Sequence, residues 1–375
     1  MGEDRGGGGG RKAARIVAIS ACRFATPPTR AKRRAYAPLP LKGGRSPSGT
    51  LTMALLEIEG LGVEIRTPLG PIGILRDLSL SLERGESLGL VGESGCGKSM
   101  TALAIMGLLP EAARAKGRIA LEGRNLLDLG EAELCRLRGR RLAMVFQEPM
   151  TALNPVRSIG DQVAEGLRLH LGLDRRRALD RAAALLARVG LPPADFPPGL
   201  HPHQLSGGQR QRVVVAMALA CGPDVLIADE PTTALDVTIQ AQILDLIAEL
   251  AAEEGMALIL ISHDLGVIAE MTDRMAVMYA GAIVESGPTA EVFGMRAHPY
   301  TEGLFAALPS LQARPGARLA SIPGQVPDPL QRPPGCAFSP RCPRATRACQ
   351  APPRRSALGA GHEVSCFHPL RAGAS

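Results

Sequence analysis

The chain has 375 residues, of which 45% are hydrophobic and 21% charged. Its apolar runs all fall short of the roughly 18 residues that a membrane-spanning helix needs, so we expect it to serve a membrane only through a partner. Residues 1–52 carry 11 basic and two acidic residues, a charge of +9, whereas the other 323 residues sum to −2, which gives the chain its net charge of +7. This distribution predicts no nucleic-acid partner.

Residues 1–52 are predicted to form a disordered basic tail. They contain five consecutive glycines, scattered Arg and little apolar periodicity, so they cannot bury enough surface to offset the entropy of ordering. An Arg-rich, acid-poor tail is also typical of an organelle transit peptide. The alternative is that synthesis starts at Met53 and that residues 1–52 come from a misassigned start.

Strand and helix patterns alternate from residue 55 onward. Short β-like runs occupy residues 55–58, 63–65 and 79–82, and a buried strand is predicted at 87–91. Residues 99–109 are apolar on nearly all sides, which predicts a buried helix that Pro110 ends. Residues 149–222 are mostly helical in pattern, and strands at 225–228 and 257–261 enclose a helix at 239–253. This alternation predicts a parallel α/β sheet.

A glycine-rich loop with the spacing of a phosphate-binding loop follows the strand at 87–91. Its predicted ligand-binding residues are Gly92, Ser94, Gly95, Cys96, Gly97, Lys98, Ser99 and Met100. Glycines allow the backbone N–H groups to surround a phosphate at a helix N-terminus. Lys98 is predicted to bind the β- and γ-phosphates, and the Ser99 hydroxyl to bind Mg²⁺. A tight turn without a ligand is the alternative, but the flanking strand and helix favour the phosphate site.

The strand at 225–228 ends in two acidic residues, Asp229 and Glu230. Phosphate and metal bind at the C-terminal edge of such a sheet. Asp229 is predicted to hold Mg²⁺ through water, and Glu230 to act as the general base that polarises the attacking water. A strand that ends in a solvated loop fits the two acids equally well, and it is the phosphate loop upstream that favours the catalytic interpretation.

A second glycine-rich turn, at residues 205–209, precedes an apolar helix predicted at 213–220. Its residues are Leu205, Ser206, Gly207, Gly208 and Gln209. Such a turn offers a second anion site, and two phosphate sites in one chain indicate a nucleotide shared between two chains.

This turn resembles the signature motif of the ATP-binding-cassette (ABC) ATPases. Gln147 matches the Q-loop glutamine, Asp236 the D-loop aspartate and His263 the switch histidine of that family. A single Gln or His at a strand end is more often a structural residue, so the resemblance rests on five motifs in the family's order. One departure concerns Ile65, which takes the position where most members place an aromatic ring against adenine, so the contact with the base is expected to be weaker.

The resemblance implies an α/β P-loop NTPase cassette over residues 53–305, with a RecA-like core, an antiparallel β subdomain and a helical subdomain. It implies ATP and Mg²⁺ as cofactors, with ATP bound between the phosphate loop of one cassette and residues 206–209 of a second. Ser206 and Gly208 would contact the partner's γ-phosphate. Glu230, His263 and Gln147 would be catalytic, and Gln147 would also contact Mg²⁺ and the membrane subunit.

Four further segments resemble the ATP-binding subunits of oligopeptide and dipeptide importers. They are residues 102–110, residues 147–155, His298-Pro299-Tyr300 and Ile322-Pro323-Gly324. The resemblance implies a second, distinct cassette, two transmembrane permease subunits and an extracytoplasmic substrate-binding protein as partners. It places the chain peripherally on the cytoplasmic face of a bacterial inner membrane. An importer of nickel or another small solute, and a soluble ABC ATPase without a transport role, are the alternatives.

Four cysteines gather in the C-terminal region, residues 306–375, which is predicted to be a Cys-rich extension. They are Cys336, Cys342, Cys349 and Cys366. Clustered cysteines in a cytosolic chain indicate metal ligands, and four thiolates suit a [4Fe–4S] cluster or Zn²⁺. The lack of a two-residue spacing argues against a zinc ribbon. Peptide-importer cassettes that resemble this chain use this arrangement for iron and sulfur, so a [4Fe–4S] cluster is expected, with zinc and free thiols as alternatives.

Overall fold

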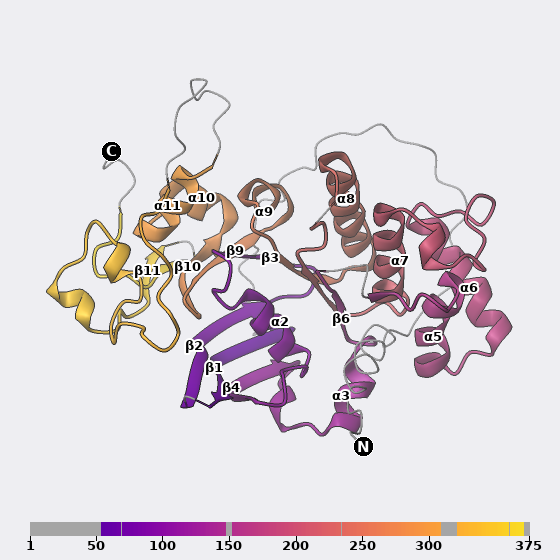
Figure 1. Cartoon of the computed structure of the whole chain (residues 1–375), viewed down its shortest axis with the longest axis horizontal. Coiled ribbons are helices and arrows are strands. Elements are labelled where there is room, and N and C mark those ends of the chain that lie inside the picture. Colours follow the sequence, from indigo (N-terminus) through magenta and orange to yellow (C-terminus); the bar gives the residue numbers. More distant parts are fainter. Residues whose placement is uncertain are drawn as a thin grey trace, which may run out of the picture.

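The computed structural model describes residues 54–68, 70–147, 152–233, 235–308, 321–359 and 361–370. The predicted tail at 1–52, residues 148–151 of the importer-like segment and Ala234 of the D-loop lie outside them. Two sheets form the framework, with helices α5 and α6 at one end of the molecule and the C-terminal segment at the other (Figure 1). Among the described helices, none is both long and apolar enough to cross a bilayer.

The larger sheet has the strand order β11-β12-β10-β9-β3-β8-β7-β6. Its parallel strands are β6 (Leu142–Val145), β7 (Val225–Asp229), β8 (Ala257–Ile261), β3 (Ser87–Val91) and β9 (Arg274–Tyr279). The antiparallel strands β10 (Ala282–Pro288), β12 (His362–Val364) and β11 (Ser356–Gly359) extend one edge. The C-terminal segment therefore adds two strands to the sheet that carries the phosphate loop.

Successive side chains of β7 enter two different cores because a strand alternates its faces. Leu226 and Ala228 pack into the core formed with the helices, whereas Val225 and Ile227 pack toward the smaller sheet. Burial of both faces explains why β8 and residues 225–228 of β7 are uninterrupted apolar runs, as is typical of parallel strands. The predicted parallel α/β sheet is confirmed.

Nine α-helices are described. They are α2 (Lys98–Ile105), α3 (Glu131–Leu137), α5 (Ile159–Leu171), α6 (Arg175–Arg188), α7 (Gly207–Leu219), α8 (Val237–Glu254), α9 (Leu265–Met271), α10 (Thr289–Met295) and α11 (Pro299–Ala306). The prediction that the helix after the phosphate loop reaches residue 109 is wrong. Gly107 adopts φ +64°, and the Leu108 N–H bonds back to the Leu103 carbonyl at 2.8 Å, which ends α2 in a left-handed cap before Pro110.

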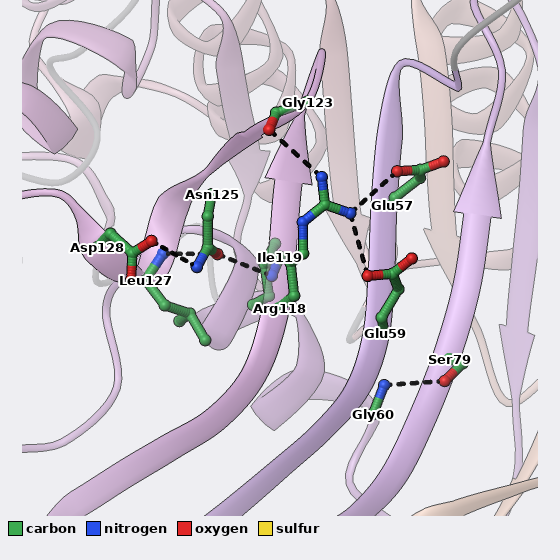
Figure 2. Close-up of polar contacts among 10 residues, drawn as sticks. All are labelled: Glu57, Glu59, Gly60, Ser79, Arg118, Ile119, Gly123, Asn125, Leu127 and Asp128. Atoms are coloured by element: carbon green, nitrogen blue, oxygen red, sulfur yellow. Dashed lines mark hydrogen bonds and ion pairs between the residues drawn. The ribbon is translucent and has the colours of Figure 1, made fainter.

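The smaller, antiparallel sheet has the order β2-β1-β4-β5, with β1 (Leu56–Thr67), β2 (Gly70–Leu82), β4 (Ala113–Leu121) and β5 (Arg124–Asn125). The two short runs predicted at 55–58 and 63–65 are one strand whose register shifts between them. At this irregularity the Gly60 N–H donates to the Ser79 hydroxyl at 2.9 Å (Figure 2). Arg118 of β4 reaches Glu57 and Glu59 of β1, which ties the two strands together on the polar side of the sheet (Figure 2).

Candidate functional site

The phosphate loop, residues 92–99, connects β3 to the N-terminus of α2. Gly92 has φ +150°, and a Cβ there would lie 2.2 Å from the carbonyl oxygen of Met278. Gly97 forms the N-cap of α2 with φ +109°, a conformation that residues other than glycine rarely adopt. Ser94, Gly95 and Ser99 are exposed. The loop therefore presents the start of a helix to solvent, which is the arrangement that binds phosphate.

Lys98 lies beneath this loop and is 6% exposed. Its Nζ donates to the carbonyls of Gly92 at 2.7 Å and Glu93 at 3.2 Å, and it approaches Cys96 Sγ at 3.7 Å. Cys96 is itself buried, and burial raises the pKa of its thiol. The ammonium group is thus held against the backbone of the loop that it is predicted to serve, and Met100 follows on α2, half-buried.

Asp229 is the last residue of β7 and is 4% exposed. Burial raises the pKa of its carboxyl, an effect opposed by a hydrogen bond with Ser99. Its Oδ1 has no hydrogen-bond partner among the described residues. A buried carboxylate oxygen without a partner, next to a serine hydroxyl, fits the oxygen ligands that Mg²⁺ prefers, directly or through water.

Glu230 brings together three side chains from different parts of the chain. Its Oε2 accepts from Gln147 Nε2 and from Thr233 Oγ1, each at 3.0 Å, and lies 3.5 Å from His263 Nδ1. The backbone of Glu230 has φ +44°, and its N–H donates to the Ile261 carbonyl at 3.0 Å. Strained non-glycine residues concentrate at functional sites, because the surrounding structure must offset their cost.

The structure thus brings the residues that are predicted to form one nucleotide site together at the carboxyl ends of β3, β6, β7 and β8. Thr233 joins them, although sequence reasoning missed it. The signal was available, since a hydroxyl three residues after Glu230 reaches the carboxylate across a tight turn, and the Thr233 N–H also bonds the Glu230 carbonyl at 3.2 Å.

The signature turn belongs to a separate part of the molecule. Ser206 caps α7, and its side chain and that of Gln209 form a reciprocal capping box, with bonds of 3.3 Å and 2.8 Å. Gly208 packs so closely against α8 that a Cβ would meet Ile239 Cγ2 at 2.7 Å, and Gly207 starts the helix. Between described residues, no hydrogen bond or ion pair joins this turn to the phosphate loop.

Two further predicted positions are less informative. Asp236 is exposed and forms the N-cap of α8 without a side-chain hydrogen bond. Ile65 lies on β1 opposite Ile72 of β2 and Ala113 of β4, and it is half-buried against the smaller core. Neither of these two strand partners of Ile65 is aromatic.

The four C-terminal cysteines are close enough to affect one another's pKa. Cys336 donates its N–H to the Cys349 carbonyl at 2.9 Å. Burial, with smaller contributions from the other three thiols, raises the pKa of Cys366 to about 11. All four are free cysteines, and no group of three or more His, Cys, Asp or Glu side chains in the described part of the chain is arranged to hold a metal ion. The structure gives the predicted [4Fe–4S] cluster and the zinc alternative no support.

Comparisons with known proteins agree with this geometry. The ABC transporter family matches residues 75–233, and the C-terminal region of oligopeptide/dipeptide transporters matches residues 284–349. The oligopeptide transport ATP-binding protein OppD of Salmonella typhimurium is 47% identical over 316 residues, covering 84% of this chain and 94% of that protein. A Brucella abortus protein, described as a candidate peptide import ATP-binding protein, is 51% identical over 326 residues, covering 84% and 96%.

Solved structures share the fold. The dimeric ATP-binding cassette MJ0796 with ADP and phosphate has a TM-score of 0.56 and 26% identity, covering 62% of this chain and 98% of that one. The cassette cbiO1 of Clostridium perfringens has a TM-score of 0.54 and 28% identity, covering 64% and 90%. With its nucleotide motifs placed on this fold, the chain belongs to the ATP-binding cassettes of the ABC transporter family and is an ATPase of the oligopeptide/dipeptide transporter group.

Proposed function

We propose that this chain hydrolyses ATP to power the import of oligopeptides or dipeptides into a bacterial cell. The observation that carries the catalytic part is the convergence of Gln147, Thr233 and His263 on the carboxylate of Glu230, beside the phosphate loop. The match of residues 284–349 to the transporter C-terminal region and the names of the relatives support peptides as the cargo.

In this proposal the chain binds its own nucleotide with the phosphate loop. The backbone N–H groups of Gly95, Gly97 and Lys98 would donate hydrogen bonds to the phosphate oxygens. Lys98 Nζ would exchange its bonds to the loop carbonyls for bonds to the β- and γ-phosphates. Ser99 and Asp229 would hold Mg²⁺, which neutralises phosphate charge when bound. The unpartnered Oδ1 of Asp229 supports this placement.

Glu230 is the proposed general base. A carboxylate there can take a proton from a water positioned for attack on the γ-phosphate. Gln147 and Thr233 fix its orientation by donating to the same oxygen, Oε2, which leaves Oε1 to bind the water. His263 has a side chain 70% exposed and would contact the γ-phosphate and that water.

The proposed working unit is a pair of cassettes. Ser206, Gly208 and Gln209 lie at the N-terminus of α7, in a different element from the chain's own phosphate loop, and would complete the site of a second, homologous cassette. The dimeric state of the solved cassette MJ0796 supports this pairing. Two permease subunits and an extracytoplasmic substrate-binding protein are the other proposed partners, which places the chain at the inner face of the membrane.

Two substitutions test the catalytic proposal. Glu230→Gln should lower ATP turnover by about 10²–10⁴-fold while MgATP binding is retained, because the amide cannot take the proton. Lys98→Ala should abolish binding itself. Steady-state ATPase and equilibrium binding of MgATP separate the two effects, and full turnover in Glu230→Gln would refute the assignment. For the cargo, ATPase of the assembled importer should rise with added peptides and not with nickel.

The [4Fe–4S] cluster remains a proposal that rests on the sequence resemblance, and no catalytic step is assigned to it. Iron and acid-labile sulfide content after anaerobic purification, compared between the wild type and Cys349→Ser, tests it. Absence of both elements from the wild type would leave the thiols free.

A further inference from the structure

Two motifs that the nucleotide chemistry does not use meet at Glu93, the second residue of the phosphate loop. One motif is His298-Pro299-Tyr300 at the start of α11, and the other is Ile322-Pro323-Gly324. Arg341, next to Cys342, completes the group. These residues lie far from the phosphate loop in sequence and close to it in the fold.

The side chain of Glu93 is held by Arg341. Nη1 and Nη2 of Arg341 donate to Oε2 and Oε1 of Glu93 at 2.7 Å and 3.0 Å, a bidentate pair. The Arg341 side chain is 4% exposed and that of Glu93 29%. Such charge-assisted, paired hydrogen bonds fix geometry as well as adding energy.

The remaining donors of Arg341 bind the second motif. Nε donates to the Pro323 carbonyl at 2.9 Å, and Nη2 to the Ile322 carbonyl at 3.2 Å. The guanidinium also lies 5.8 Å from the ring centre of Tyr279 and 5.9 Å from that of Phe338. Its position is therefore set by the C-terminal segment and not by Glu93 alone.

The backbone of Glu93 is held by the first motif. Its N–H donates to the Tyr300 hydroxyl at 2.8 Å. Tyr300 is completely buried, and its own N–H donates to Nδ1 of His298, which caps α11 at 3.0 Å. The Tyr300 ring packs against those of Tyr279 and Phe338, with centroids 4.6 Å and 5.4 Å away. The Tyr300 end of this hydrogen bond is therefore fixed by the core.

The backbone carbonyl of Glu93 is also one of the two that accept a hydrogen bond from Lys98 Nζ. A displacement of Glu93 would therefore shift both the loop backbone and the lysine that it presents to phosphate. We infer that Arg341 and Tyr300 are positioning residues of the phosphate loop, through which the C-terminal segment sets the affinity of this cassette for MgATP. The inference rests on the proposed nucleotide site at residues 92–99.

A purely structural tether makes a different prediction. Loss of the pair would then lower the melting temperature, but the folded protein would bind MgATP with unchanged affinity. The test is equilibrium binding of MgATP to the full chain, in a Glu230→Gln background that prevents turnover, at a temperature at which each variant is folded by circular dichroism.

Arg341→Ala should weaken MgATP binding about tenfold, since it removes both bonds of a buried, charge-assisted pair. Arg341→Lys keeps one charge contact, so its affinity for MgATP should lie between those of Arg341→Ala and the wild type. Tyr300→Phe removes only the hydroxyl and should weaken binding about threefold. The matched control is Arg355→Ala, whose partners are Glu363 and the Ser79 carbonyl, and its affinity should equal that of the wild type.

A double-mutant cycle identifies the partner. If Arg341 acts through Glu93, the variant with both Glu93→Gln and Arg341→Ala should bind no more weakly than Arg341→Ala alone. The inference would be overturned if the double variant lost affinity by the product of the two single losses. Unchanged affinity for MgATP in Arg341→Lys and Tyr300→Phe would overturn it as well. Lys98→Ala distinguishes failure of the proposed nucleotide site from failure of the positioning role. If Lys98→Ala still binds MgATP, the nucleotide site is refuted. If Lys98→Ala loses binding while the Arg341 variants bind like the wild type, only the positioning role is refuted.

Discussion

His298 is a buried imidazole that the fold keeps neutral, and this makes the stability of the protein depend on pH. The side chain is 1% exposed, and burial lowers the pKa of His298 from 6.5 to about 4, against a small opposing effect of Glu285. The Glu285 carboxylate accepts hydrogen bonds from the backbone N–H groups of Ala297 and His298, at 2.7 Å and 2.8 Å. It also forms a hydrogen bond with His362 Nε2 at 2.8 Å. Both oxygens of Glu285 are thus already engaged in hydrogen bonds, and the effect of burial outweighs the stabilisation that this carboxylate gives to a charged His298.

The sign follows from where protons bind. Between pH 6.5 and 4 the unfolded chain protonates His298 and the folded chain does not, so acid favours unfolding. The contribution of His298 to stability is complete above pH 6.5 and is lost progressively toward pH 4. The full difference corresponds to about 3 kcal/mol.

His298→Asn isolates this effect, because the Asn side-chain oxygen can cap α11 but does not titrate. Urea unfolding at pH 7, 6, 5 and 4 gives the free energy of unfolding of each protein. We expect the wild type to lose about 3 kcal/mol more than His298→Asn over this range. His203→Asn, which removes an exposed imidazole, serves as the control and should follow the wild type. Parallel losses in the wild type and His298→Asn would refute the reasoning.

Three further substitutions are predicted from local geometry. Gly281→Ala should lower the free energy of unfolding, measured by heat or urea, by at least about 2 kcal/mol more than Gly222→Ala does. Both glycines have positive φ, but only at Gly281 would a Cβ lie 1.9 Å from the Ile74 carbonyl oxygen. Equal losses of stability would contradict the steric argument. Ser206→Ala should cost about 1 kcal/mol through loss of the α7 capping box and should also reduce ATP-dependent dimerisation, measured by sedimentation, while Ser206→Thr keeps the cap. Ile227→Ala should cost about 2–5 kcal/mol and Ile227→Val about 0.5–1.5 kcal/mol in unfolding, since Ile227 is fully buried; a cost near zero would show that the site collapses.

The nucleotide motifs were predictable because each is local. A phosphate loop needs only glycines, Lys98 and Ser99 at fixed spacing between a strand and a helix, and the structure places them so. The end of α2 was not predicted, since the left-handed cap at Gly107 competes with the visible signal of Pro110. The family resemblance implied catalytic roles for Gln147, Glu230 and His263. Their convergence on the Glu230 carboxylate was not predicted and could not have been derived from the separate strands.

The sequence by itself determined the parallel sheet, the phosphate loop and the acidic end of β7, because burial patterns and glycine spacing act over a few residues. Only the tertiary structure decided what surrounds the loop. Glu93 meets Arg341 across 248 positions and Tyr300 across 207, and β12 joins the sheet through β10. Contacts of this range depend on how cores pack and on which buried charges find partners, and no local pattern records them.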